Sequence, residues 1–497
     1  MNATNIVRAL VYLPASFLLL YPVLSTPVVA DDFINPFYQV HLTEGSPVAT
    51  ARYGWDIGLH GVNFRILGHP VGALWNWLWI ATSAQFDVSM TTLYALTKFI
   101  VFILCAMSVA LFWCVASRVY GRGIQYWDSL VMTSLALFGT LQIHGLWSND
   151  PVASYPLAGY AAAALGFGVL SCAILAVKYQ TWYSFVIGSA VALTAVLYYE
   201  MNLGAILGAG VILAGGCWVR RRNRRELVVS LMGSAILTAP AALALLYGRI
   251  MTGERAANYG GTEVRLSGAT RAFTLGSLSS LPGSAWELSE RVIGGRVGVV
   301  YFVFGVTFLI VWLVRWWLKC SDPWKGVGTD DVLSRHQGRW MVVGAVVLFS
   351  AFAVAIQAVT TKVQDETPGV GYVYTYYAVT SCAVALGLVV GARALFSRPK
   401  FHAVKFIVCS TAVMLLFMQS TVNWRVSKTM NDWVMPNRRL LNAFDVDAGK
   451  EQRCQALADW TAGGWPEYYE FNMIVGLDKS YLHYFGQPFC AGFERSG

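Results

Sequence analysis

The sequence predicts an all-α protein that crosses a membrane many times. Its 497 residues are 56% hydrophobic and only 13% charged, and the mean hydropathy is +0.52. A soluble protein carries about 25% charged residues. The apolar residues lie in long runs, several of which reach the ~20 residues that a helix needs to cross the hydrocarbon core. The net charge of +9 therefore points to basic cytoplasmic loops rather than to a nucleic acid partner.

Hydropathy and helix-breaking residues predict about eleven transmembrane helices. We expect them at residues 9–30, 92–117, 127–145, 154–177, 181–198, 203–219, 226–248, 297–318, 339–360, 373–396 and 403–421. Residues 67–83 are apolar but short and contain three tryptophans, so we expect a helix that lies in the membrane interface. Residues 1–421 then form a transmembrane module, and residues 422–497 form a small C-terminal domain.

Positive charge orients these helices, because Lys and Arg collect in cytoplasmic loops. With the N-terminus in the cytoplasm, that side receives Arg118, Arg122, Lys178, Arg220, Arg221, Arg222, Arg224, Arg225, Arg315, Lys319, Lys325, Arg393, Arg398, Lys400 and Lys405. The outer side receives a first loop at 31–91, a long loop at 249–296 and the C-terminal domain. A transmembrane helix at 67–83 would move the arginine block outside, which argues against it. Cleavage of the first apolar run as a signal peptide after Ala30 is the alternative for the N-terminus.

Two of the nine cysteines, Cys454 and Cys490, fall in the outer C-terminal domain, and the others lie in or beside the expected membrane helices. Because the outer compartment is oxidising, we expect these two to form a disulfide. Two free buried thiols are the alternative.

Carboxylates stand where several expected helices meet the outer side. They are Asp31 and Asp32 after the first helix, Asp150 in the second outer loop and Glu200 in the third. Ionisable groups at membrane depth are costly and commonly functional. The alternatives are that the Asp31–Asp32 pair is a solvated helix flank and that Glu200 forms a structural ion pair with an arginine.

The long outer loops are rich in arginine and nearly free of lysine. Arginine can bind phosphate with two parallel hydrogen bonds. We therefore expect Arg52, Arg65, Arg255 and Arg265 to bind the phosphate group of a donor substrate. Neutralisation of the glutamates in the same loops is the alternative role. The spacing of His, Cys and Asp predicts no metal site, and neither a Walker nor a Rossmann pattern is present.

This combination fits sugar transfer from a lipid-linked phosphate. A carboxylate takes the proton of the attacking hydroxyl, and arginines stabilise the charge that develops on the departing phosphate. In-line displacement at C1 then inverts its configuration. No cofactor is required beyond the lipid-linked donor.

The stretch "ADDF" at 30–33, directly after the first apolar run and before a long outer loop, resembles the GT-C superfamily of integral membrane glycosyltransferases. The resemblance implies that Asp32 or Asp31 is the catalytic base, with Asp150 as a second acid and Glu200 nearby. Within this superfamily, the chain is similar to bacterial enzymes that use polyprenyl-phosphate sugars, such as O-antigen glucosyltransferases of the GtrII type or actinobacterial arabinosyl- and mannosyltransferases. It implies a lipid-linked sugar donor, a glycan or glycolipid acceptor, and a place in the bacterial cell membrane.

Three other functions remain open at this point. A transporter or flippase of lipid-linked sugars would also be polytopic, but transporters place charges near the membrane midplane. Here Lys98 is the main charge inside an expected helix. An O-antigen-type polymerase would suit the arginine-bearing loop at 249–296, and a non-catalytic assembly protein would not need carboxylates on one face.

Overall fold

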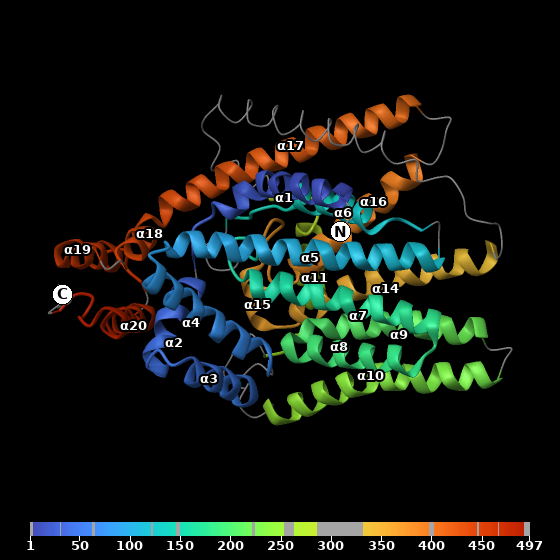
Figure 1. Ribbon diagram of the computed structural model, residues 1–497, viewed down its shortest axis with the longest axis horizontal. Coiled ribbons are helices and arrows are strands. Elements are labelled where there is room, and N and C mark those ends of the chain that lie inside the picture. Colours follow the sequence, from blue (N-terminus) through green and yellow to red (C-terminus); the bar gives the residue numbers. More distant parts are fainter. Residues whose placement is uncertain are drawn as a thin grey trace.

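Long helices that lie side by side in a bundle make up most of the molecule. The computed structural model describes residues 3–29, 31–61, 65–120, 123–145, 150–220, 224–252, 263–285, 332–396, 402–444, 447–465 and 467–491. In these residues the regular structure is helical, apart from one isolated antiparallel bridge between Val264 and Thr360. The long helices run side by side along the longest axis, and the C-terminal helices gather at one end (Figure 1).

The long helices coincide with the expected membrane helices. They are α1 (Ala3–Leu24), α5 (Met90–Tyr120), α6 (Tyr126–Thr140), α7 (Ala162–Tyr179, preceded by the π-helical turn η1, Leu157–Ala161), α8 (Trp182–Tyr198), α9 (Leu203–Arg220, preceded by the 3-10 turn η2, Glu200–Asn202), α10 (Arg224–Thr252), α14 (Val332–Ala358), α16 (Tyr377–Phe396) and α17 (His402–Trp433). The helix expected at 297–318 lies outside the described residues.

By length and composition, five stretches of the described residues can cross a membrane: Met90–Tyr120, Leu157–Tyr179, Glu200–Trp218, Arg224–Gly248 and Arg339–Ala358. Three shorter apolar helices accompany them at Leu10–Leu24, Trp182–Tyr198 and Tyr377–Arg393. The prediction of a multi-pass helical membrane protein is confirmed at this level. The described part of the chain gives fewer full-length spans than the eleven expected, partly because α6 ends at Thr140, where residues 141–145 leave the helical conformation.

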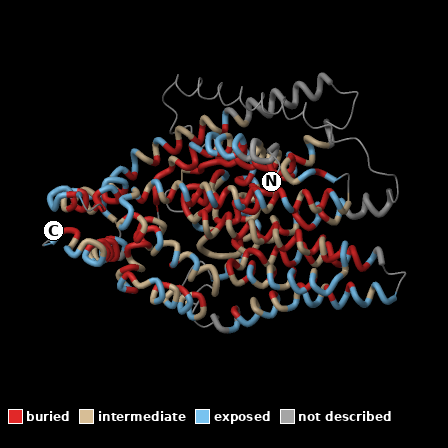
Figure 2. Tube along the Cα trace, in the orientation of Figure 1, coloured by how far each residue is buried: buried red, intermediate tan, exposed pale blue. Residues whose placement is uncertain are grey.

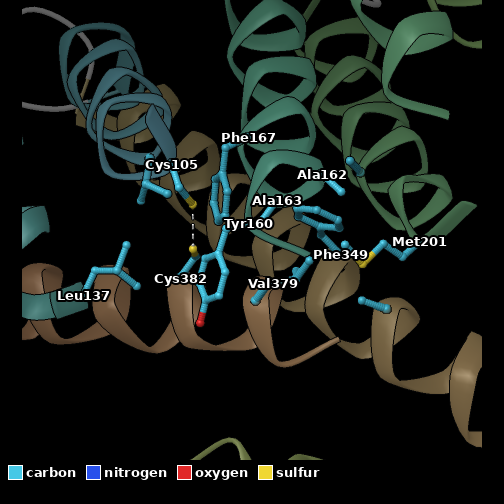
Figure 3. Close-up of a cluster of buried hydrophobic side chains, with 14 of the residues drawn as sticks. Cys105, Leu137, Tyr160, Ala162, Ala163, Phe167, Met201, Phe349, Val379 and Cys382 are labelled. Atoms are coloured by element: carbon cyan, nitrogen blue, oxygen red, sulfur yellow. Dashed lines mark hydrogen bonds between the residues drawn. The ribbon is translucent and has the colours of Figure 1, made fainter. Parts of the chain in front are cut away.

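The membrane core depends on small residues and on aromatic packing. In α9, a Cβ added at Gly204 or Gly208 would lie 2.8 Å from a backbone carbonyl oxygen of α14, so glycine lets these two helices approach closely. Beside that contact, Tyr160, Phe167 and Phe349 fill the space between the helices, and Cys105 Sγ lies 3.4 Å from Cys382 Sγ (Figure 3). Buried residues are concentrated along the middle of the bundle, and the outer helix faces are exposed (Figure 2).

The first outer loop folds into three helices, α2 (Asp31–Thr43), α3 (Pro47–His60) and α4 (Gly68–Phe86). Ser46 caps α3 by accepting from Ala49 N–H, and Pro47 occupies the first turn, where it needs no backbone hydrogen bond. The tryptophan-rich segment expected at the interface is α4. At its first residue, a Cβ on Gly68 would lie 2.3 Å from the Tyr198 carbonyl oxygen, so α4 starts directly against the end of α8.

The C-terminal helices pack against this loop. Helices α18 (Met435–Asn442), α19 (Lys450–Thr461) and α20 (Glu467–Phe485) share one hydrophobic core with α2 and α4. A Cβ at Gly476 of α20 would lie 2.7 Å from the carbonyl carbon of Phe37, so α20 and α2 are in backbone contact. Cys454 and Cys490 form a disulfide across 36 residues of sequence and tie α19 to the segment after α20.

Replacing Cys454 or Cys490 with Ser should lower the melting temperature of the purified protein. The cross-link restricts the unfolded chain and thereby raises the free energy of unfolding by about 2–4 kcal/mol. A thermal unfolding scan in detergent measures this, with Cys172→Ser, a free cysteine of α7, as the control. Dithiothreitol should lower the melting temperature of the wild-type protein and of Cys172→Ser alike. An equal response of Cys454→Ser to the reductant would contradict the assignment.

Candidate active site around Asp32

A cavity of about 170 Å³ lies where α2, α4 and α5 meet η1 and the end of α8. Its lining combines one carboxylate, one guanidinium, amides and aromatic rings: Asp32, Gln39, Arg65, His69, Trp75, Asn76, Trp79, Tyr94, Tyr155, Tyr198 and Tyr199 are among its residues. Two of the sequence-predicted site residues, Asp32 and Arg65, therefore share one cavity.

The first turn of α2 brings Asp32 into this cavity, where two groups from distant elements bind its Oδ2 atom. The hydroxyl of Tyr94 on α5 donates to Oδ2, and the backbone N–H of Tyr155 donates to the same atom at 2.9 Å. Burial raises the pKa of Asp32, and these two hydrogen bonds offset only part of that effect. A buried carboxylate with a raised pKa accepts a proton more readily near neutral pH.

Tyr155 reaches Asp32 through an unusual backbone. Its φ of 58° is in the left-handed region, which costs free energy for a residue other than glycine. Its side-chain hydroxyl bonds to Asp31, which connects the two adjacent aspartates to the same residue. Burial raises the pKa of the Tyr155 hydroxyl well above its ordinary value, so it remains protonated. Backbone strain that persists at a cavity commonly serves function.

Asp150 shapes the loop that carries Tyr155. Its side chain is fully buried and accepts four backbone N–H bonds, from His144, Gly145, Val152 and Ala153, at 2.7 to 3.2 Å. These bonds fold the chain on both sides of Asp150 around its carboxylate. Asp150 is linked to Asp32 through this loop, because Ala153 donates its N–H to Asp150 and its carbonyl oxygen accepts from the Tyr94 hydroxyl that also binds Asp32.

Arg65 and Glu200 form a bidentate ion pair at the edge of the cavity. Arg65 Nε and Nη2 donate to the two carboxylate oxygens of Glu200 at 2.8 and 2.6 Å. The guanidinium carbon lies 3.8 Å from the centre of the Tyr199 ring, within cation–π range. Burial acts most strongly and lowers the pKa of Arg65, but the charge of Glu200, its hydrogen bonds and the neighbouring tyrosines together outweigh it, and the net pKa is raised.

His69, the second residue of α4, is a neutral group beside this pair. Burial, and then the charge of Arg65, lower the pKa of His69 to about 4 despite the opposing effect of Glu200. Within the described residues its Nε2 is buried with no hydrogen-bond partner. A buried polar atom of this kind at a cavity wall is available to a ligand.

The other predicted phosphate ligands do not join this cavity. Arg52 is exposed on α3 and is not part of the cavity lining. Arg265 lines a separate cavity of about 290 Å³ beside α11 (Ala269–Ser279) and α15 (Thr361–Glu366), where it donates to Gln364 and Asp365 at 2.6 Å. Arg255 lies outside the described residues.

Sequence reasoning missed the residues that hold Asp32. Tyr94 was part of an expected membrane helix, and the signal that could have identified it is Lys98, one turn further along α5. Lys98 Nζ lies 4.5 Å from the centre of the Tyr94 ring and donates to the Thr26 carbonyl oxygen at 3.1 Å. Tyr155 gave no signal, because the residue before a proline normally avoids helical backbone angles and its left-handed angle is not foreseeable.

Comparisons with known proteins add a distant likeness to a solved structure. A comparison with family models finds no match, and a comparison with curated protein sequences finds none. Among solved structures, the chain is similar to the archaeal oligosaccharyltransferase AglB from Archaeoglobus fulgidus, determined with an inhibitory peptide and a dolichol-phosphate, with a TM-score of 0.37 and 13% sequence identity. The alignment covers 98% of this chain and 61% of AglB, so this chain matches less than two thirds of that protein's length.

Proposed function

We propose that this chain is an integral membrane glycosyltransferase in which Asp32 is the general base. The proposal depends above all on one observation, which is that one oxygen of the Asp32 carboxylate has no hydrogen-bond donor among the described residues. Within the described part of the chain, both hydrogen bonds to Asp32 end on Oδ2. Oδ1 therefore stays available to a hydroxyl group that enters the cavity, and geometry of this kind is the first requirement of a general base.

The cavity chemistry suits a sugar. Gln39 and Asn76 place amide groups at the wall, joined by a hydrogen bond of 2.9 Å, and amides both donate to and accept from hydroxyl groups. His69 Nε2 offers one more polar atom, and Trp75 and Trp79 offer apolar faces. At about 170 Å³ the cavity is smaller than the about 300–1,000 Å³ typical of ligand pockets, which favours a single sugar ring.

The reaction is an inverting displacement. The acceptor hydroxyl attacks C1 of the sugar while its proton passes to Asp32 Oδ1. The bond between C1 and the phosphate oxygen breaks, and the electron pair leaves with the polyprenyl phosphate. Arg65 is the cation of the cavity, and its pairing with Glu200 leaves Nη1 and one N–H of Nη2 for the phosphate. Binding charge that develops on the leaving group is a large contribution to catalysis.

In this proposal Asp150 and Glu200 position other groups rather than transfer protons. Asp150 holds the loop that presents the Tyr155 N–H, and Glu200 orients Arg65. The acceptor is a cell-envelope glycan or glycolipid, and the reaction takes place on the outer face of a bacterial cell membrane. Mass spectrometry of envelope glycans with and without this gene tests the function. Glycans that lack the sugar, together with lipid-linked sugar retained on the inner leaflet, would support the transporter alternative.

Replacing Asp32 with Asn should lower transfer activity by about 100-fold or more, because the amide keeps the shape of the side chain but cannot take a proton. Donor binding should change little. The measurement is transfer of labelled sugar by purified protein, with the exposed Asp56→Asn of α3 as control. Full activity in both Asp32→Asn and Asp31→Asn would remove the base assignment.

The pH profile of kcat/KM should rise as Asp32 loses its proton. Because burial raises the pKa of Asp32, the midpoint of the rising limb should lie above the ordinary value of about 3.9 for an aspartate. In Tyr94→Phe the hydroxyl that stabilises the ionised form is absent, so the midpoint should move to still higher pH. The same profile in the wild-type protein and in Tyr94→Phe would contradict this account.

Replacing Arg65 with Lys should raise the KM for the donor by about tenfold, since a lysine cannot bind Glu200 in a bidentate manner and also present N–H groups to a phosphate. Initial-rate kinetics at varied donor concentration measure this. Arg439→Lys is the matched control, because Arg439 forms an ion pair of 2.9 Å with Asp459 in the C-terminal helices. If both variants respond alike, the phosphate is bound elsewhere.

A further inference from the structure

A larger hollow than the cavities at Asp32 and Arg265 lies inside the transmembrane bundle. It has a volume of about 1,000 Å³ and runs between α5, α14 and α16, with α11 across one end. Its walls are mostly valine, alanine and leucine, and two of them, Val343 and Val347, are exposed, at 44% and 61%. Because these residues belong to a stretch that can cross a membrane, the described residues form a groove whose α14 side is exposed at the depth of the lipid phase.

Two arginines line one end of this groove. Arg339, near the start of α14, donates through Nε to the Tyr120 carbonyl oxygen at 3.1 Å. The Arg393 guanidinium, near the end of α16, lies 5.8 Å from the centre of the Trp113 ring. Tyr120 ends α5 and Trp113 lies two turns before it, so both guanidinium groups lie toward the same end of the bundle.

The opposite end of the groove is closed. There Thr380 of α16 donates to Ser280, in the turn after α11, at 2.8 Å, and Phe273 and Leu281 complete the wall. From Arg339 to Val354, the groove follows α14 for about 22 Å at a rise of 1.5 Å per residue. One leaflet contributes about half of a hydrocarbon core of about 30 Å, so the groove can hold the full length of acyl chains that start at the arginines.

The groove is also separate from the Asp32 cavity. Tyr94, at the cavity, and Trp113, at the groove, lie on the same helix about 28 Å apart at 1.5 Å per residue. That distance approaches the thickness of the hydrocarbon core. The arginines therefore lie near the membrane face opposite to that of Asp32, which is the side that the positive-inside rule assigns to the cytoplasm.

We propose that this groove binds one anionic phospholipid from the leaflet on the same side as the two arginines. Its phosphate binds Arg339 and Arg393, and its acyl chains lie along α14 and α16. Arginine binds phosphate with two parallel N–H bonds, and basic pockets between membrane helices are a recognised way of holding anionic lipid head groups. The apolar wall alone would accept any acyl chain. The paired positive charge at its mouth selects a lipid with a net negative charge. This inference does not depend on the proposed transfer reaction.

Native mass spectrometry of the purified full-length protein tests the proposal without an activity assay. The protein is stripped of lipid in neutral detergent and titrated with palmitoyl-oleoyl phosphatidylglycerol or phosphatidylcholine. We expect the first phosphatidylglycerol to bind about tenfold more tightly than phosphatidylcholine. The double variant Arg339→Gln and Arg393→Gln should lose this preference, and Arg118→Gln, an exposed arginine at the same end of α5, should keep it.

A second pair of variants tests the acyl chains. A Cβ added at Gly387, which lines the groove, or at Gly344, which does not, meets no atom within 4 Å, so both sites accept a larger side chain. Gly387→Leu should weaken binding of phosphatidylglycerol at least about fivefold and Gly344→Leu should not. Equal affinity for the two lipids in the wild-type protein, or equal effects of Gly387→Leu and Gly344→Leu, would overturn the proposal. So would a wild-type protein that binds no phospholipid, the result expected if residues 297–318 of the chain itself fill the groove.

Discussion

The buried carboxylate of Asp32 is the constraint on which the site depends. A charge taken out of water is costly unless hydrogen-bond donors replace the water. Its donors come from two distant parts of the sequence, the Tyr94 hydroxyl and the Tyr155 N–H. Helices α2 and α5 and the loop at 150–156 must therefore keep one arrangement. Lys98 of α5 supports this arrangement by donating to the carbonyl oxygen of Thr26. Thr26 follows the end of α1 and lies five residues before α2 begins.

The C-terminal helices have a place in the same arrangement. Helix α2 is amphipathic, with Asp32 on the side of the cavity and Phe33 and Phe37 in the core that it shares with α18, α19 and α20. Without that core, two large aromatic side chains at the membrane surface would be open to water. The C-terminal region therefore covers the back of the helix that carries the proposed base, and its disulfide restrains a part of the molecule that bears on the cavity.

The sequence predicted the elements better than it predicted their partners. Long apolar runs required membrane helices, and the tryptophan-rich segment after the first run forms a helix, α4, that is not among the stretches of the described chain with the length and composition of a membrane span. The joining of Cys454 to Cys490 followed from the oxidising compartment that the topology assigned to them. Side-chain partners across the fold carry no such local signal. An ion pair of Glu200 with an arginine could be stated only as an alternative, without Arg65 as the partner, and the four bonds to Asp150 depend on a loop geometry that no pattern of residue types encodes.

The carboxylates near the cavity differ in what they can still bind, and that difference bears on the stereochemistry of transfer. Asp150 accepts four backbone N–H bonds, and Glu200 has both oxygens on Arg65, so either could take a proton or attack a sugar only by giving up these partners. Retention of configuration requires a second carboxylate about 5–5.5 Å from the first, free to act as a nucleophile. Asp32 keeps one oxygen available, and in the proposed reaction it serves as a base toward the incoming hydroxyl. Of these three carboxylates in the described part of the chain, Asp32 alone keeps an oxygen available, which favours one displacement at C1, and one displacement inverts it.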